Sequence, residues 1–265
     1  MAYRCPVLAA LIAGRTEGLR VAPDVVAIAQ EVSEACQRRG AAARLLGGVA
    51  IYLSCPSAQR SELSRPYQDI DFVVRRASAQ KFGQACQDVG FVPDRRFNSL
   101  HGDRRLLFSR GDLELDAFVD VFEQSQKLDF SQRLGGPGAT ISLADLLLTK
   151  LQIFEINEKD LKDVVTLLLD HPPDRSAQPA ALRMQELERV LCGNWGFYAT
   201  FMDNLDRVPR VAHDALPDAE AAAVEERVRT LREALAAAPK SLAWTARARI
   251  GRRMAWYEVP EEKSR

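Results

Sequence analysis

The segment of residues 69–74, with the sequence DIDFVV, sets two carboxylates directly before an apolar run that is typical of a buried strand. In a strand, residues i and i+2 point to the same face and lie about 7 Å apart along the chain, so Asp69 and Asp71 converge while Ile70 faces the core. Like charges this close repel, and burying either costs several kcal/mol unless it is paired or bound to a metal. The segment therefore indicates either two solvated acids at the start of a strand or a site for hard divalent cations such as Mg²⁺, which take oxygen ligands.

The composition limits the classes of protein to which the chain can belong. Its 265 residues are 47% hydrophobic, which suits one large globular domain or two smaller ones. The 36 basic and 36 acidic residues cancel, so any nucleic-acid binding has to come from a local patch. Five scattered cysteines without a CxxC pair predict reduced, mostly buried thiols and a cytoplasmic location. The longest early apolar stretch, residues 6–14, is far shorter than the roughly 20 residues of a membrane span, so we expect a helix there and no membrane partner.

The predicted elements mix helices and strands in the first part of the chain and are helical in the second. We expect helices at 22–40 and 78–91, short strands before Gly47 and at 69–74, and three antiparallel strands at 91–102, 103–110 and 112–122. Residues 49–53 fit a helix or a strand by pattern alone. Helical sequence returns at 142–170, with a break near Asn157, and again at 181–257.

The segment 171–179 contains three prolines and is the best candidate for a linker. The predicted organisation is an α/β domain at 1–172, a linker at 173–180 and a helical C-terminal domain at 181–265.

Two features near the acidic strand are suited to binding an anion. The pair Gly47–Gly48 lies between a strand and the apolar run, where glycines and a helix start let a phosphate approach the backbone, although an ordinary tight turn is the commoner use of such a pair. Lys150 stands among apolar residues, either to reach an anion or to extend to the surface along its own stem. Lys159 and Asp163, four residues apart on the next helix, fit a surface ion pair.

A third acid for a metal site is available on the strand DLELDAFVDV. Asp112, Glu114, Asp116 and Asp120 share one face by the alternation of a strand, and apolar residues occupy the other face. Alternation does not choose among these four, and a half-exposed strand with a polar outer face explains the same pattern. The strand therefore predicts either a solvated edge or the carboxylate that completes a metal site.

Together these segments resemble the polymerase-beta-like nucleotidyltransferase superfamily. The resemblance rests on LLGGVA, RPYQDIDF and LELDAF, and it covers roughly residues 23–170. The helix LLLTKLQIFEINEKDLKD looks like the lysine-and-aspartate motif of the abortive-infection toxin branch, and the stretch PKSLAWTARARIGRRMAWYEVPEE is similar to uncharacterised bacterial relatives. The toxin branch usually keeps an arginine between its motif lysine and its Lys-Asp pair, and this chain has none between Lys150 and Lys159. The resemblance implies the nucleotidyltransferase fold, a mixed sheet flanked by helices with a helical C-terminal part.

The resemblance also implies an activity, the Mg²⁺-dependent transfer of a nucleoside monophosphate from a nucleoside triphosphate to an acceptor hydroxyl, with two metal ions. Asp116 aligns with the third carboxylate of the family, and Glu114 is its rival. The residues implied as catalytic and metal-binding are Asp69, Asp71 and Asp116, and those implied as nucleotide-binding are Gly47, Gly48, Arg65 and Lys150. The acceptor is not specified, and RNA is one candidate. Toxin–antitoxin systems are one setting for such a protein, by analogy of fold.

The C-terminal stretch combines basic and aromatic residues, which are Lys240, Arg247, Arg249, Arg252 and Arg253 with Trp244, Trp256 and Tyr257. Basic side chains neutralise phosphates and aromatic rings stack on bases, so the stretch suits an RNA. A solvated basic helix whose tryptophans dock onto the core explains it as well. The alternative function is accordingly a non-catalytic nucleotide- or RNA-binding regulatory protein on the same fold.

Overall fold

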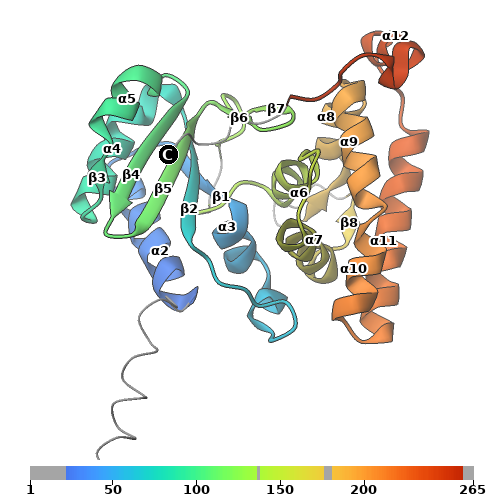
Figure 1. The fold of residues 1–265 in the computed structure, drawn as a ribbon, viewed down its shortest axis with the longest axis horizontal. Helices are drawn as coiled ribbons and strands as arrows, with labels where there is room; N and C mark the ends of the chain where they lie inside the picture. Colours follow the sequence, from blue (N-terminus) through green and yellow to red (C-terminus); the bar gives the residue numbers. More distant parts are fainter. Residues whose placement is uncertain (1–21, 136–137, 176–180, 259–265) are drawn as a thin grey trace, which may run out of the picture.

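A five-stranded mixed sheet lies on one side of the molecule, and a group of helices lies on the other (Figure 1). The structure is a computed structural model, and it describes residues 22–135, 138–175 and 181–258. The predicted helix at 6–14 and Cys5 lie outside these residues. The strands of the sheet, in spatial order, are β1 (Ala43–Leu46), β2 (Asp69–Val74), β5 (Leu113–Val119), β4 (Arg105–Arg110) and β3 (Val92–Pro93). Only β2 and β5 are parallel, and the other neighbours are antiparallel.

Helices cover the sheet and build the rest of the molecule. Those near the sheet are α2 (Ala22–Arg38), α3 (Gly47–Ser54), α4 (Ala79–Asp88) and α5 (Arg95–His101). The helices on the far side are α6 (Leu143–Leu151), α7 (Glu158–Asp170), α8 (Met184–Leu191), α9 (Trp195–Leu205), α10 (Val208–Ala215), α11 (Asp218–Ala237) and α12 (Leu242–Ile250). The predicted fold class, a mixed sheet flanked by helices with a helical C-terminal part, is confirmed.

The two faces of the sheet differ because the side chains of β2 alternate. Phe72 of β2 is fully buried and meets Phe82 of α4 edge-on at 5.3 Å, and Phe82 meets Phe108 of β4 at 5.9 Å. The residue before Phe72 therefore points to the opposite face, toward α3, α6 and α7. One face of β2 is therefore part of the core, and the other face carries Asp69 and Asp71.

Several predicted elements are corrected by the structure. The strand expected at 91–102 is wrong beyond Pro93, because the side chain of Asp94 accepts a hydrogen bond from the Phe97 amide and caps helix α5. The ambiguous run after Gly48 is helix α3. The strand expected at 112–122 is interrupted at Asp120, whose φ is 60°, and continues as β6 (Val121–Glu123), which pairs with β7 (Lys127–Asp129). The break near Asn157 is confirmed, since Asn157 caps α7.

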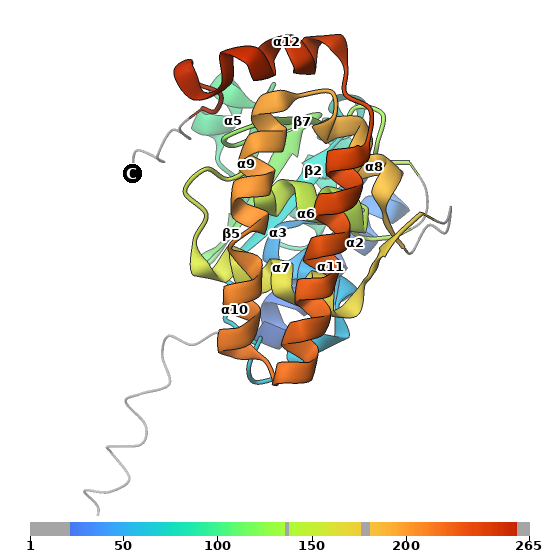
Figure 2. The same ribbon diagram turned by 90° about the vertical axis from the view of Figure 1, so that its right-hand side faces the viewer.

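The helices α6 and α7 join the two sides of the molecule. Both contact α3, which follows β1, and both also contact the C-terminal helices (Figure 2). Asn204 of α9 donates hydrogen bonds to the carbonyl oxygens of Leu151 and Ile153 at 3.1 and 2.7 Å, which fixes the end of α6. In the predicted linker, β8 (Pro173–Asp174) pairs with β9 (Leu182–Arg183). The domain boundaries at 172 and 181 stay a prediction.

Two expectations from composition concern cysteines and membranes. Cys36, Cys55, Cys86 and Cys192 are free and buried, as predicted, and burial raises the pKa of each thiol. Over the described ranges, none of the helices combines the length and apolar composition that crossing a membrane requires.

Candidate active site

The parallel pairing of β2 with β5 brings acidic residues from two segments onto one face. Asp69 lies opposite Glu114, and Asp71 lies opposite Asp116. Directly opposed residues of neighbouring strands point to the same side of a sheet, so the four carboxylates share the face toward α6. Asp116 is only 6% exposed, whereas Glu114 is exposed. The structure thus places the sequence-predicted acids Asp69, Asp71 and Asp116 side by side.

Asp71 shows how close these charges are. Its pKa is raised from an ordinary value to about 7, first by burial and then by the neighbouring carboxylates of Asp69 and Asp116. The cations of Lys150 and Arg105 act in the opposite direction. Because Asp116 acts on Asp71 directly, the geometry favours Asp116 over Glu114 as the third acid of the cluster. A bound cation would reduce the repulsion between these carboxylates and so favour the ionised form of Asp71.

Arg105, which the sequence reasoning missed, is paired with the third acid. Its Nη2 donates a hydrogen bond to Oδ2 of Asp116 at 2.5 Å, and its guanidinium lies over the ring of Phe118 at 5.1 Å. The register of β4 and β5 explains this, because Leu107 lies opposite Asp116 and Arg105 lies opposite Phe118, all on one face. The register follows from the short connection between the strands predicted at 103–110 and 112–122, so counting back from that connection would have indicated Arg105.

The glycine pair makes room for side chains of the chain itself. Gly47 begins α3 with a φ of 73°, and a Cβ at this position would lie 2.3 Å from Oδ2 of Asp71. A Cβ on Gly48 would lie 2.1 Å from Nη2 of Arg65. Only glycine allows both approaches. The start of α3 is therefore bordered by a carboxylate on one side and a guanidinium on the other.

A buried ion-pair network surrounds Lys150, which is 7% exposed and so does not extend to the surface. Its Nζ lies 2.6 Å from Oδ1 of Asp160 and 2.8 Å from Oδ2 of Asp163. Arg65 donates two hydrogen bonds to Asp163, from Nε at 3.0 Å and from Nη2 at 2.7 Å. The interpretation of Asp163 as a surface partner of Lys159 is therefore wrong, because Asp163 is 4% exposed and faces the core.

The charges in this network hold one another in their ionised forms. Burial alone would lower the pKa of Lys150, but the carboxylates of Asp163 and Asp160 outweigh burial and raise it above the usual value. Burial alone would likewise raise the pKa of Asp163, but Lys150 and Arg65 hold it below its usual range. The sequence-predicted cations Lys150 and Arg65 are thus joined through Asp163. Arg65 lies next to Gly48, and Lys150 is within electrostatic reach of Asp71.

The residues at this site fit a hard divalent cation in their chemistry. Carboxylate oxygens are the ligands that Mg²⁺ takes, and Asp69, Asp71 and Asp116 supply them from adjacent strands. Over the described residues, no group of three or more His, Cys, Asp or Glu side chains is already arranged to hold a metal ion. At Asp116, Arg105 already donates a hydrogen bond to one of the two carboxylate oxygens.

The basic C-terminal stretch is largely engaged within the chain. Lys240 donates to the carbonyl oxygens of Leu235 and Ala238, each at 2.6 Å, and so caps α11. Arg252 pairs with Asp203 at 2.7 Å, and Arg247 donates to the carbonyl oxygen of Gly251 at 2.6 Å. These contacts favour docking of the stretch onto the helices over its use as an open RNA-binding patch.

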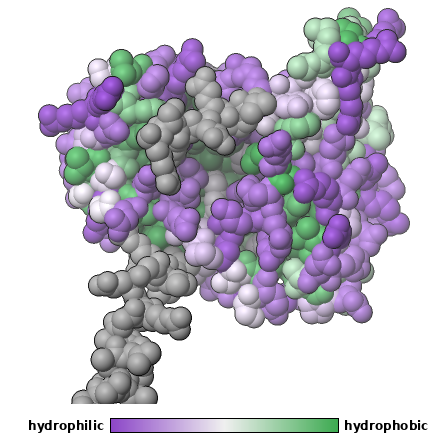
Figure 3. Space-filling view, viewed as in Figure 1, coloured by the Kyte–Doolittle hydropathy of each residue, from purple (hydrophilic) through white to green (hydrophobic). Residues whose placement is uncertain are grey.

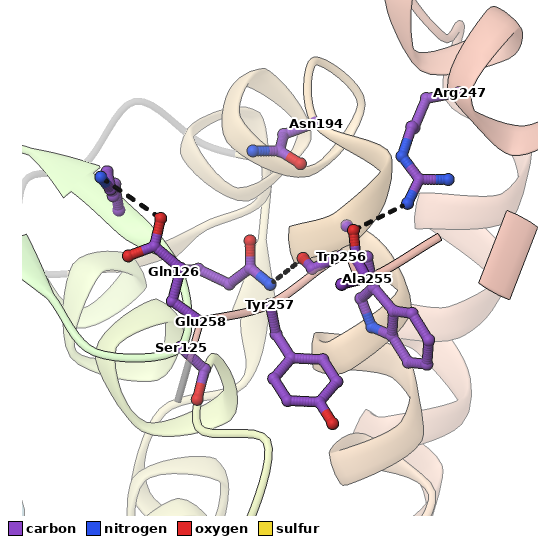
Figure 4. Close-up of a pocket in the computed structure, with 10 residues that line it drawn as sticks. Ser125, Gln126, Asn194, Arg247, Ala255, Trp256, Tyr257 and Glu258 are labelled. Carbon is purple, nitrogen blue, oxygen red and sulfur yellow. Dashed lines mark hydrogen bonds and ion pairs between the residues drawn. The ribbon is translucent and has the colours of Figure 1, made fainter. Parts of the chain in front are cut away.

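The aromatic residues of this stretch also pack within the chain. The ring centroids of Trp244 and Tyr198 are 5.4 Å apart and those of Trp256 and Trp195 are 6.2 Å apart, while Phe197 and Phe201 are buried in the core. A cavity of about 430 Å³ lies between residues 255–258 and the loop at 125–127 (Figure 4). The surface around α12, at the upper right of Figure 3, shows apolar and charged residues side by side, with Leu242 91% exposed.

Comparisons with known proteins give few matches. No family model and no curated protein matches the chain. The solution structure of the antibiotic-resistance factor ANT(2'')-Ia is 13% identical, with a TM-score of 0.36, over 88% of this chain and 100% of that one. The crystal structure of ANT(2'')-Ia in complex with adenylyl-2''-tobramycin is 14% identical, with a TM-score of 0.34, over 79% of this chain and 98% of that one.

Proposed function

We propose that the protein is a Mg²⁺-dependent nucleotidyltransferase of the polymerase-beta-like superfamily. The observation that carries this proposal is the register of β2 and β5, which sets Asp71 beside Asp116 and against Gly47 at the start of α3. Carboxylates next to a glycine-bounded helix start, with buried cations nearby, combine sites for metal and for phosphate. The motif order in the sequence supports the same proposal independently of the contacts.

The roles of the residues follow from their places. Asp69 and Asp71 would hold a metal ion with the triphosphate, and Asp116 would hold a second ion with Asp71. When bound, Mg²⁺ supplies the charge that clamps the attacking and leaving oxygens of an in-line displacement. Lys150 and Arg65 are preorganised cations that offset the negative charge developing on the phosphates.

The proposed reaction exchanges a phosphoanhydride bond of the triphosphate for a phosphate ester bond to the acceptor. The acceptor oxygen forms a bond to the α-phosphorus, the bond from the α-phosphorus to the bridging oxygen breaks, and pyrophosphate leaves. The proton of the acceptor hydroxyl passes to Asp116 or to water. Gly47 and Gly48 seat the triphosphate at the start of α3.

The first prediction tests the acids directly. Asp69→Asn and Asp71→Asn remove a negative ligand at almost constant volume, so each should lower transfer of label from an α-labelled triphosphate at least about 100-fold. Asp214→Asn, on the exposed face of α10, is the matched control and should leave transfer unchanged. Wild-type transfer that persists in both strand variants would exclude this assignment.

The acceptor is best found without assuming its class. Each labelled triphosphate is incubated with the protein and separately with RNA, protein and small-molecule fractions of a cell extract, and an aminoglycoside such as tobramycin forms one further arm. Label in the RNA fraction would identify RNA as the acceptor. Growth arrest on expression, abolished by Asp71→Asn, would support a toxin of the abortive-infection kind.

A non-catalytic regulatory protein is the second candidate, and the pairing of Arg105 with Asp116 favours it because it occupies the third acid. Calorimetric titration separates the two. The enzyme should bind a triphosphate only together with Mg²⁺, whereas a regulatory binding protein should bind its ligand equally well in EDTA.

A further inference from the structure

Arg105 and Asp116 form an ion pair at the edge of the acid cluster. The side chain of Asp116 is 8% exposed and that of Arg105 is 27% exposed. The side chain of Arg105 therefore has more access to water than that of Asp116. If Asp116 takes another partner, the arginine is the member of the pair that moves.

The pair is also held by fewer hydrogen bonds than the other arginine–carboxylate pair of the site. Arg65 donates two hydrogen bonds to Asp163. This bidentate geometry strengthens the ion pair and fixes its orientation. Arg105 reaches Asp116 through Nη2, and its buried Nε makes no hydrogen bond with any described residue. Lys150, the other cation facing Asp71, is held by two carboxylates of its own. Of Arg65, Lys150 and Arg105, Arg105 would therefore break the fewest polar contacts on leaving its carboxylate partner.

We infer that Arg105 is an internal counter-ion that competes with a divalent cation for Asp116 and sets the affinity of the site for that cation. This inference rests on the proposed function, because it concerns the same three acids. The hydrogen bond from Arg105 takes one of the lone-pair positions that Asp116 could offer to a metal ion, and the positive charge of Arg105 repels an incoming cation. Removing the guanidinium frees the oxygen and makes the site more negative, so cation binding should tighten.

The test measures Mn²⁺ binding to the full chain without nucleotide, by electron paramagnetic resonance and by calorimetry. Arg105→Gln should bind Mn²⁺ at least about tenfold more tightly than wild type. Arg104→Gln is the matched control, since Arg104 is the neighbouring, exposed arginine and contacts Asp103 rather than the cluster. The double variant Arg105→Gln/Asp116→Asn should lose the gain, because the freed ligand is then absent.

A second variant distinguishes a change in cation affinity from a folding defect. Arg105→Lys keeps the positive charge with a smaller donor group, and its Mn²⁺ affinity should lie between those of wild type and Arg105→Gln. In EDTA, the melting temperature of Arg105→Gln should fall below that of Arg104→Gln, and Mn²⁺ should restore it. Unchanged Mn²⁺ affinity in both Arg105 variants would overturn the inference.

The outcomes separate this inference from the proposed function. Tighter Mn²⁺ binding in Arg105→Gln without any nucleotidyl transfer by wild type would support the counter-ion and refute the enzyme. Transfer that is lost in Asp71→Asn, with no effect of Arg105→Gln on Mn²⁺ affinity, would support the enzyme and refute the counter-ion.

Discussion

Asp71 is the residue whose surroundings most alter its chemistry. An aspartate in an unfolded chain has a pKa of about 3.9, and burial beside Asp69 and Asp116 raises that of Asp71 to about 7. The folded state therefore binds a proton more tightly than the unfolded state. Stability from this group is fully present below pH 4, is lost as the pH rises toward 7, and is level above it.

We therefore predict that Asp71→Asn becomes more stable relative to wild type as the pH rises. In EDTA, the difference in unfolding free energy between variant and wild type should grow by on the order of 4 kcal/mol from pH 4 to pH 8, as measured by thermal and urea unfolding. Asp214→Asn should show no such trend, because its carboxylate is exposed. A pH-independent difference for Asp71→Asn would mean that its pKa is not raised.

At the scale of elements, the ion-pair network joins the loop before β2 to α6 and α7. Asp163 of α7 forms ion pairs with two cations, Lys150 and Arg65. Asp160 forms an ion pair with Lys150. Breaking a buried pair from one side is strongly destabilising, since it leaves a charge without its partner in a poorly solvated place. The two aspartates should accordingly differ in importance.

The prediction is that Asp163→Asn lowers the unfolding free energy by about 3 kcal/mol or more and that Asp160→Asn lowers it by roughly 1 kcal/mol. Urea unfolding of both variants checks this, and the exposed pair of Lys162 with Glu158 supplies the control Glu158→Gln, which should be nearly neutral. Equal losses at 160 and 163 would show that Lys150, and not the shared Asp163, is the centre of the network.

At the scale of the whole molecule, the segment 255–258 ties the C-terminal helices to the rest of the chain. Gln126 donates to the carbonyl oxygen of Trp256 at 2.8 Å, and the amide of Glu258 donates to the carbonyl oxygen of Ser125 at 3.0 Å (Figure 4). Tyr257 stacks on Phe154 at 3.5 Å. The chain thus returns from α12 to the loop that connects β6 and β7, which follow the acidic strand β5.

Gly196 of α9 allows this return and provides a sharp test. A Cβ at Gly196 would lie 2.6 Å from the carbonyl oxygen of Trp256, so Gly196→Ala should displace the segment. Alanine in a helix is otherwise better than glycine by about 1 kcal/mol, and Gly83→Ala in α4, where the nearest atom is 3.8 Å away, should show that gain. We expect Gly196→Ala to lose stability and to speed proteolysis near residue 254. A stabilised Gly196→Ala would mean that the segment is not held there.

The local features of this protein can be predicted from short stretches of its sequence. The alternation of DIDFVV and LELDAF placed the acids on one face of each strand, and the pattern predicted the break near Asn157, where the structure shows that Asn157 caps α7. These depend on neighbours within a few residues, which a pattern shows. Asp94, which caps α5, could have been predicted from the sequence in the same way, but the segment was assigned to a strand. The pattern left open whether the run after the glycine pair is a helix or a strand, and the structure shows helix α3.

Which of these features come into contact depends on how the whole chain folds. The parallel register of β2 and β5 chose Asp116 as the neighbour of Asp71, and the packing of α6 and α7 against α3 turned Asp163 inward to Lys150 and Arg65. It also placed Arg105 on the third acid. Spacing along a chain fixes the direction of a side chain but not its distant partners. Those partners depend on strand order and helix packing, in which charges and shapes from many segments have to be satisfied together.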